Sequence, residues 1–463
     1  MEQHATVGLL PLYLALYDEK LPTLRTELLP LLERVQSGLE AEGIVVLPGA
    51  IARTADEVKA VVARFLETGV DAIATLHLAY SPSLEAISVL KEAGRPLVLL
   101  DTSLDSAFGL GTNPLRLLQN HGVHGVQDLA SVLRRESVAY KVVAGDSASA
   151  NFYKRSAEAI RGARAARLLQ GMRVLRVGTE FPGMGDFRVS PALLQHKWGI
   201  QVDEIAPAAL LPAAVAITED AIQIELSTDI AQYNCEISET VHRRSLKVDL
   251  ALRSYLETGH YGAFSVNFLN FTENTGPLCT VPFLECSKAM ARGLGYAGEG
   301  DILTAALVGA LNGGFSEAGF TELFCADWAG ESLFFSHMAE SNPALSAVRP
   351  RLCEKDFPFT GALNPAMLAC APRPGPATLI NLAPGPENTF SLITAEVDIL
   401  EDGTHPDIIN WVRAWMRPKQ SVPAFLEAYS DAGGTHHSAI LPGHRTEALA
   451  WFARLSGMQH VVI

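Results

Sequence analysis

Four short segments in the second half of the chain each supply a carboxylate or an imidazole. They are Ala-Gly-Glu299-Gly-Asp301, Phe-Cys-Ala-Asp327-Trp, Ser-His337-Met and Gly-Gly-Thr-His436-His437. Two carboxylates with two imidazoles form a ligand set that suits Mn²⁺, Co²⁺ or Mg²⁺ better than a thiolate-rich structural zinc site would. Because the segments are far apart in the chain, only tertiary folding can bring them together.

The two carboxylates have different settings. Glu299 stands between glycines, just ahead of an apolar run at residues 302–311. It could be a capping anion at the start of a helix, or a ligand that the glycines allow the backbone to bring close. Asp327 lies in apolar sequence, where a buried carboxylate needs a paired charge or a metal. Glu322, five residues before Asp327, is a rival on chemistry alone.

The histidines leave alternatives open as well. His337 follows an apolar run, so it could be a hydrogen-bonded core residue or a ligand. Adjacent residues in a strand face opposite sides, so one of His436 and His437 could bind a metal while the other contacts a substrate. His121 and His124 have a spacing that puts both rings on one face of a helix. They could form a second metal site or belong to a polar loop.

The elements that must position these residues follow an α/β pattern at first. Short β-rich runs at residues 7–10, 43–47, 72–76 and 96–100 have the character of buried parallel strands. Between two of them, Thr54-Ala-Asp-Glu57 is a capping box ahead of an apolar stripe. This alternation predicts a doubly wound parallel sheet. Since no strand leads into a Gly-x-Gly-x-x-Gly or Walker loop, we expect no nucleotide cofactor.

Two more regions follow. A second α/β region contains expected strands at residues 172–178 and 263–269 and expected helices near 248–256 and 282–293. Beyond about residue 320, β-rich runs at 377–382, 389–394 and 397–400 are separated by Pro and Gly, which predicts a mainly antiparallel, barrel-like domain. We therefore expect Rossmann-like α/β domains at residues 1–170 and 171–320, and a β-rich domain at 321–463.

Composition narrows the possible partners. A net charge of -15 argues against nucleic acid or an anionic membrane surface as a partner. No apolar stretch has the character of a spanning helix or an export signal, so we expect a cytoplasmic protein. The six cysteines form no Cys-x-x-Cys pair and are expected to be reduced thiols.

The four segments that supply the candidate metal ligands resemble the signature segments of the L-arabinose isomerases, within the wider L-fucose/L-arabinose isomerase superfamily. The resemblance implies a three-domain aldose–ketose isomerase that forms a trimer or hexamer, with a Mn²⁺ site at a subunit interface and a cis-enediol intermediate. By motif, Glu299, His337 and His437 take three ligand places. The second carboxylate aligns with Asp327 or, with a different gap, with Glu322, and the superfamily's Ala-Asp pattern favours Asp327. Glu299 and Asp327 would then also act as base and acid.

The resemblance also implies residues that contact the sugar. His124 matches a histidine that a neighbouring subunit contributes, Met184 and Phe271 match pocket residues, and His436 lies beside the metal ligand His437. His121 stands where the family has a glutamine, and the segment at residues 12–17 lacks another substrate-binding glutamine. These differences leave open a different aldose, such as a 6-deoxyhexose or an anion-bearing sugar. A non-catalytic sugar-binding protein on the same scaffold is the remaining alternative.

Overall fold

The computed structural model describes residues 4–403 and 408–463 of the 463-residue chain. The chain divides into two compact units, one ending at Arg167 and one running from Leu168 to Ile463. Helix α8 (Ala150–Leu169) contains the division. The domain boundary expected at residue 170 stays a prediction.

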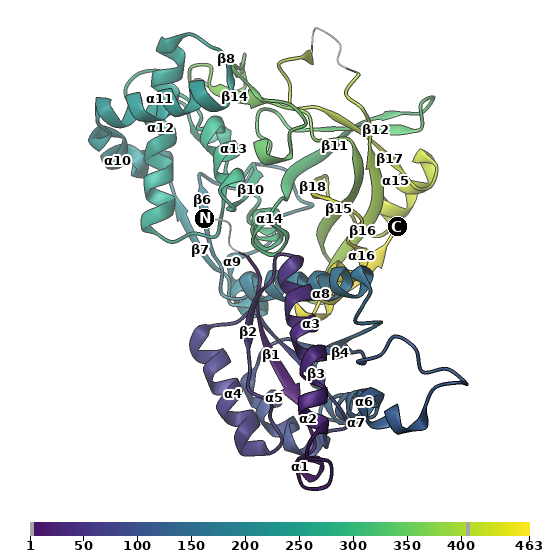
Figure 1. The fold of residues 1–463 in the computed structure, drawn as a ribbon. Coiled ribbons are helices and arrows are strands. Elements are labelled where there is room, and N and C mark those ends of the chain that lie inside the picture. The colour runs from purple at the N-terminus through teal and green to yellow at the C-terminus, as the bar shows by residue number, and fades with distance from the viewer. Residues whose placement is uncertain (1–3, 404–407) are drawn as a thin grey trace. The chain divides into compact units, whose positions relative to one another are not determined.

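The N-terminal unit is built on a five-stranded parallel sheet (Figure 1). Its strand order is β2-β1-β3-β4-β5, and every pairing is parallel. The strands are β1 (Thr6–Leu12), β2 (Val45–Pro48), β3 (Ala72–His77), β4 (Leu97–Asp101) and β5 (Tyr140–Ala144). The helices are α1 (Ala15–Lys20), α2 (Leu24–Glu27), α3 (Leu29–Ala41), α4 (Ala55–Thr68), α5 (Ile87–Ala93), α6 (Leu117–Asn120) and α7 (Gly122–Arg135).

Helix α4 shows how local sequence fixes one of these elements. The Thr54 side chain accepts a hydrogen bond from the backbone N–H of Glu57, as a capping residue should. The Glu57 carboxylate accepts from the N–H of Arg53, one residue before the expected partner. Val58 and Phe65 then face the core of the unit and are fully buried.

The second unit begins with a four-stranded parallel sheet in the order β10-β9-β6-β7. Its strands are β6 (Arg173–Val177), β7 (Gln201–Ile205), β9 (Ala263–Val266) and β10 (Gly295–Gly298). The helices of this region are α9 (Pro191–Trp198), α10 (Leu211–Ala216), α11 (Glu219–Gln232), α12 (Glu239–Thr258), α13 (Phe283–Ala291) and α14 (Ile302–Phe315). Helix α14 follows β10 and is buried along nearly its whole length, which explains its apolar sequence.

A seven-stranded, mainly antiparallel sheet completes the second unit. Its order is β15-β18-β11-β12-β17-β16-β19, and β15 also pairs with β16. The strands are β11 (Gly319–Asp327), β12 (Ser332–Ser336), β15 (Gly375–Pro384), β16 (Phe390–Ile399), β17 (Ala414–Pro418), β18 (His437–Pro442) and β19 (Gln459–Val462), with helices α15 (Val422–Asp431) and α16 (Thr446–Leu455). Strands β8 (Asn234–Glu236), β13 (Arg351–Glu354) and β14 (Ala366–Ala369) form a separate small sheet.

The predicted fold class is confirmed: two α/β regions with parallel sheets are followed by a mainly antiparallel β region. One detail of the β region was wrong, because the runs at 389–394 and 397–400 form the single strand β16. The boundary at residue 320 stays a prediction, since residues 168–463 form one compact unit.

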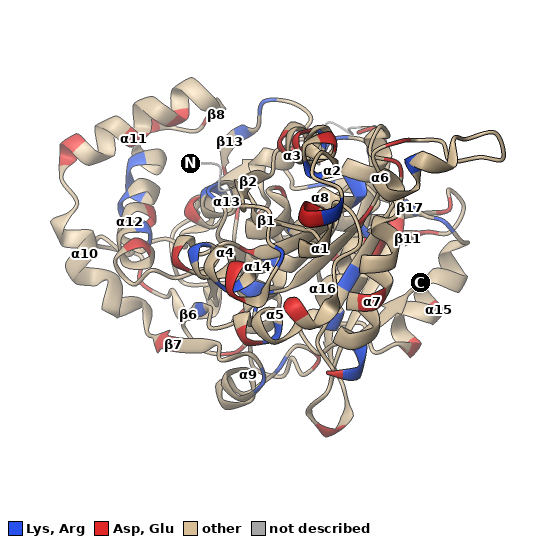
Figure 2. Cartoon of the chain, turned by 60° about the horizontal axis from the view of Figure 1, so that its bottom comes forward, with Lys and Arg blue, Asp and Glu red and all other residues tan. Residues whose placement is uncertain are grey.

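Figure 2 shows acidic and basic residues interspersed along the cartoon, and α12 carries residues of both charges. In the described part of the chain, no helix combines the length and the apolar character needed to cross a bilayer. All six cysteines are free thiols.

Candidate metal centre

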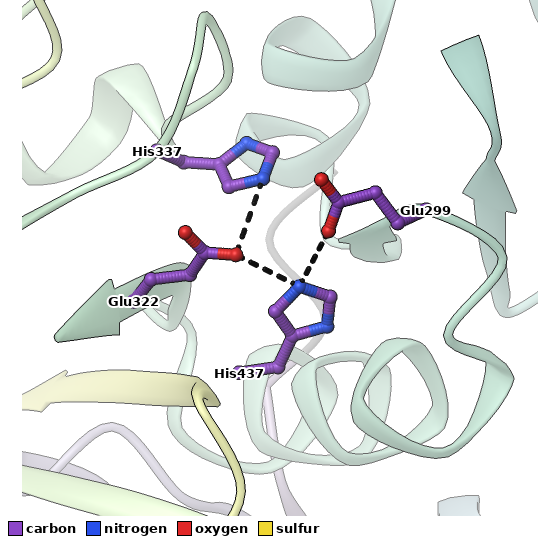
Figure 3. Close-up of side chains that lie close together, drawn as sticks. All are labelled: Glu299, Glu322, His337 and His437. Atoms are coloured by element: carbon purple, nitrogen blue, oxygen red, sulfur yellow. Dashed lines mark hydrogen bonds and ion pairs between the residues drawn. The ribbon is translucent and has the colours of Figure 1, made fainter. Parts of the chain in front are cut away.

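Four buried side chains of the second unit converge on one point: Glu299, Glu322, His337 and His437 (Figure 3). One ligand-type atom from each lies within 4.8 Å of the other three. Three of the four predicted ligands are therefore together, and the rival carboxylate Glu322 completes the group.

Glu299 is placed by a strained turn at the carboxyl end of β10. Its own φ is +62°, and that of Gly300 is +86°, both in the left-handed region. A Cβ at Gly300 would lie 2.5 Å from the carbonyl oxygen of Thr179, so only glycine fits there. The alternative role of Glu299 as a helix cap is wrong, because Asp301 caps α14 by accepting from the N–H groups of Leu303 and Thr304.

Glu322 and His437 are neighbours across two strands. In the antiparallel pairing of β11 with β18, Glu322 lies opposite His437, and on the other side of β11 it lies opposite Ser336. Opposite residues in an antiparallel pair point to the same face, with Cβ atoms about 5 Å apart. His337 directly follows Ser336, so three adjacent strands deliver three of the four side chains.

Asp327 does not belong to this group, contrary to the prediction. It lies at the exposed end of β11, where its carboxylate accepts a hydrogen bond from the N–H of Gly330. A strand advances about 3.3 Å per residue, so Asp327 is about 16 Å further along β11 than Glu322. The sequence pattern favoured Asp327 because strand register, which selects Glu322, cannot be read from the motif.

Both imidazoles are oriented by a buried carboxylate behind them. Nδ1 of His337 lies 2.6 Å from Oε2 of Glu340, and Nδ1 of His437 lies 2.8 Å from Oδ2 of Asp301. A proton held on Nδ1 leaves the lone pair of Nε2 free toward the centre of the group. Sequence inspection gave Asp301 and Glu340 no such role. An N-cap pattern ahead of residue 302 marks Asp301, whereas no local signal marks Glu340.

The donor set fits a divalent cation. Nε2 of His437 lies 2.9 Å from a carboxylate oxygen of Glu299 and 2.9 Å from one of Glu322. Nε2 of His337 is buried and has no hydrogen-bond partner among the described residues. Its nearest carboxylate oxygen, on Glu322, is 3.7 Å away. A buried polar atom left without a partner is costly, and a metal ion would satisfy it.

Comparison with known proteins assigns the family. The family model of the L-arabinose isomerase central domain matches residues 170–313, and that of the L-arabinose isomerase C-terminal domain matches residues 317–459, together more than half of the chain. The chain belongs to the L-arabinose isomerase family. It is therefore a sugar isomerase, an enzyme that interconverts aldoses and ketoses.

Individual relatives support this assignment along most of the chain. The L-arabinose isomerase of Herpetosiphon aurantiacus is 27% identical over 432 residues, which cover 89% of this chain and 84% of that protein. The L-arabinose isomerase of Saccharophagus degradans is 25% identical over 445 residues, which cover 93% of this chain and 87% of that protein.

The electrostatics of the isomerase's four-residue group favour positive charge at its centre. Burial would raise the pKa of Glu299, but the hydrogen bond with His437 and the charge of His337 bring it below its ordinary value. Burial would lower the pKa of His337, yet the carboxylates of Glu340 and Glu322 raise it to about 9. The pKa of His437 is likewise raised, against the effect of burial, by Asp301, Glu299 and Glu322. The carboxylates thus stabilise positive charge here, whether on protons or on a metal ion.

His436 lies beside the group without joining it. Its ring is partly exposed, and its Nε2 lies 3.7 Å from a carboxylate oxygen of Glu322. Asp186 accepts from the backbone N–H of His436 at 2.9 Å and lies 2.6 Å from its Nδ1. The next residue, Phe187, stacks flat on the ring of His437 at 4.6 Å between centroids. The loop around Asp186 therefore fixes both adjacent histidines.

The other residues expected to contact the sugar are in different settings. Met184 helps to line a cavity of about 230 Å³, together with Arg188 and residues 180–185 of the same loop. Phe271 is a core residue with 1% of its surface exposed.

His124 is in the N-terminal unit, on α7, and is exposed. The ring of His121 lies 5.8 Å from it and pairs instead with the hydroxyl of Tyr17 at 2.9 Å. Within residues 4–403 and 408–463, no group of three ligand-type side chains includes either histidine, so the second metal site considered above is not formed there.

Proposed function

We propose that the protein is a divalent-metal-dependent aldose–ketose isomerase, with Glu299, Glu322, His337 and His437 as the metal ligands. The observation that carries the proposal is the convergence of these four buried side chains, with Nε2 of His337 left without a hydrogen-bond partner among the described residues. Mn²⁺ is the preferred ion, and Co²⁺ or Mg²⁺ are the alternatives, because the donors are two carboxylates and two imidazoles without thiolate.

Aldose–ketose isomerisation moves a proton between C2 and C1 through a cis-enediol. The bound ion would supply Lewis-acid stabilisation of the negative charge that develops on the sugar oxygens. Glu299 and Glu322 each contact His437 through one carboxylate oxygen, Oε2 and Oε1 respectively. Their second oxygens can accept the proton from C2 and return one to C1. We assign the roles of base and acid to this pair, with Glu322 in the place first expected for Asp327.

His436 and the loop around Asp186 form the substrate side of the proposed site. Asp186 holds Nδ1 of His436, so the partly exposed Nε2 is available to a sugar hydroxyl. Met184 on the same loop lines the cavity of about 230 Å³ described above. The family resemblance further supports a homo-oligomer, a trimer or hexamer, with the site at a subunit interface to which His124 contributes.

The substrate is proposed to be L-arabinose or a closely related aldose. Leu14 and His121 stand in segments where the family resemblance places substrate-binding glutamines, which favours a changed contact to the sugar hydroxyls. The deciding experiment is a panel of aldoses, including L-arabinose, a 6-deoxyhexose and an aldose phosphate, incubated with protein and Mn²⁺ and assayed for the ketose. We expect ketose from at least one member, and none after chelation. Protein that binds Mn²⁺ yet converts no aldose would contradict the proposal and favour a non-catalytic sugar-binding role.

A further inference from the structure

Glu340 is a buried carboxylate to which the proposed chemistry gives no direct part. It lies in the loop after β12 and has 1% of its surface exposed. Its Oε1 accepts a hydrogen bond from the hydroxyl of Tyr296. Its Oε2 accepts from the backbone N–H of Ala339 at 2.9 Å and lies 2.6 Å from Nδ1 of His337. Both carboxylate oxygens are therefore used inside the protein.

Burial of the Glu340 carboxylate opposes folding unless its lost hydration is replaced. Removing a carboxylate from water costs several kcal/mol unless strong hydrogen bonds replace the solvent. Here three donors do so, and one of them is the imidazole of a proposed metal ligand. A carboxylate behind a ligating histidine fixes the ring tautomer, fixes the ring orientation, and makes the opposite nitrogen a better donor to a metal.

We propose that Glu340, held in place by Tyr296, is a positioning residue that keeps Nε2 of His337 directed at the metal. This inference rests on the metal-dependent function proposed above. Tyr296 belongs to β10 (Gly295–Gly298), and Glu299 directly follows this strand. The same strand thus places one ligand directly and a second ligand through Glu340. The Phe320 ring also packs edge-on against this imidazole, at 4.6 Å between centroids.

Glu340 gives a cleaner test than the carboxylate behind His437. Asp301 both contacts His437 and caps α14, so its removal would disturb a buried helix as well as the metal ligand. Glu340 lies outside any helix of the described structure. Among the described residues, its carboxylate has three hydrogen-bond partners: the Tyr296 hydroxyl, Nδ1 of His337 and the N–H of Ala339. A change in metal affinity can therefore be traced to His337.

The experiment is calorimetric titration of the full chain with Mn²⁺, in wild type, Glu340→Ala and Glu340→Gln. We expect Glu340→Ala to weaken Mn²⁺ binding about 10- to 100-fold. Gln can turn its amide oxygen toward Nδ1–H of His337, so Glu340→Gln should recover most of this loss. Asp229→Asn is the matched control, because Asp229 is also fully buried and binds a histidine, His242, that is not one of the four ligands. Asp229 pairs with Lys288 as well. It should lower thermal stability and leave Mn²⁺ affinity unchanged.

The outcomes separate this inference from the proposed function. Wild-type protein that binds no Mn²⁺ would refute the function itself. Normal Mn²⁺ binding in Glu340→Ala, or equal weakening in the Ala and Gln variants, would overturn the positioning role while leaving the function intact. If Glu340→Ala does not fold, Tyr296→Phe decides, because it removes one support of Glu340 and should weaken Mn²⁺ binding about two- to tenfold. Unchanged affinity in that variant would overturn the inference.

Discussion

At the scale of single residues, chemistry in the sequence identified most of the group, and strand register decided the rest. Glu299 was recognisable because the glycines beside it allow close backbone approach, and the His436-His437 pair because adjacent strand residues face opposite sides. The choice between Glu322 and Asp327 could not be made from residue type, since both are carboxylates in one apolar strand. Pairing of β11 with β18 puts Glu322 opposite His437 and leaves Asp327 exposed.

The two carboxylates of β11 give a matched pair of variants. We expect Glu322→Gln to lower kcat for aldose isomerisation about 10²- to 10⁴-fold, because a proton-transfer group and a metal ligand are lost together. Asp327→Asn should leave kcat within a factor of about two, since surface changes away from special features have small effects. Steady-state ketose formation with saturating Mn²⁺ provides the measurement. A large loss in Asp327→Asn with normal turnover in Glu322→Gln would restore the original assignment.

At the scale of elements, local signals predicted the strands of the N-terminal unit well. Residues 72–76 were expected to be a buried strand, and β3 spans Ala72–His77. What local signals could not show is how closely α7 covers the end of that strand. A Cβ at Gly125 would lie 2.2 Å from the ring of His77, and one at Gly122 would lie 2.4 Å from the His77 carbonyl oxygen. Because these residues are glycines, α7 can pack directly on His77 and bury it.

Because His77 is buried, we expect the free energy of unfolding of the N-terminal unit to fall in acid. Burial lowers the pKa of His77 to about 4, against the opposing charge of Asp128. The folded state therefore keeps His77 neutral while the unfolded state binds a proton below about pH 6.5. The stability that His77 contributes is complete above pH 6.5 and is lost as the pH falls toward 4. Between pH 7 and pH 4.5 we expect a loss of about 2–3 kcal/mol in the free energy of unfolding.

Hydrogen exchange of the slowest amides in β3 measures this loss in the full chain. His77→Gln cannot take up the proton, so its free energy of opening should fall less over the same pH range. Parallel pH profiles for wild type and His77→Gln would show that His77 does not carry the effect.

At the scale of the whole molecule, alternation of strands and helices predicted both α/β regions, and β-rich runs separated by Pro and Gly predicted the mainly antiparallel β region that follows them. Long-range pairing lay beyond the sequence pattern, because it depends on which edges meet after folding. The contact between Nδ1 of His437 and Asp301, and the stacking of Phe187 on His437, are of this kind. The complete candidate site forms only when the four-stranded and the seven-stranded sheets of the second unit are both present.

The account depends most on one ion shared by Glu299, Glu322, His337 and His437. Crystals grown with Mn²⁺ and measured for anomalous scattering at the manganese edge test it directly. We predict one strong anomalous peak within coordination distance of a carboxylate oxygen of each glutamate and of Nε2 of each histidine. A peak that omits Glu322 and includes Asp327, or no peak at this group in Mn²⁺-saturated crystals, would contradict the account.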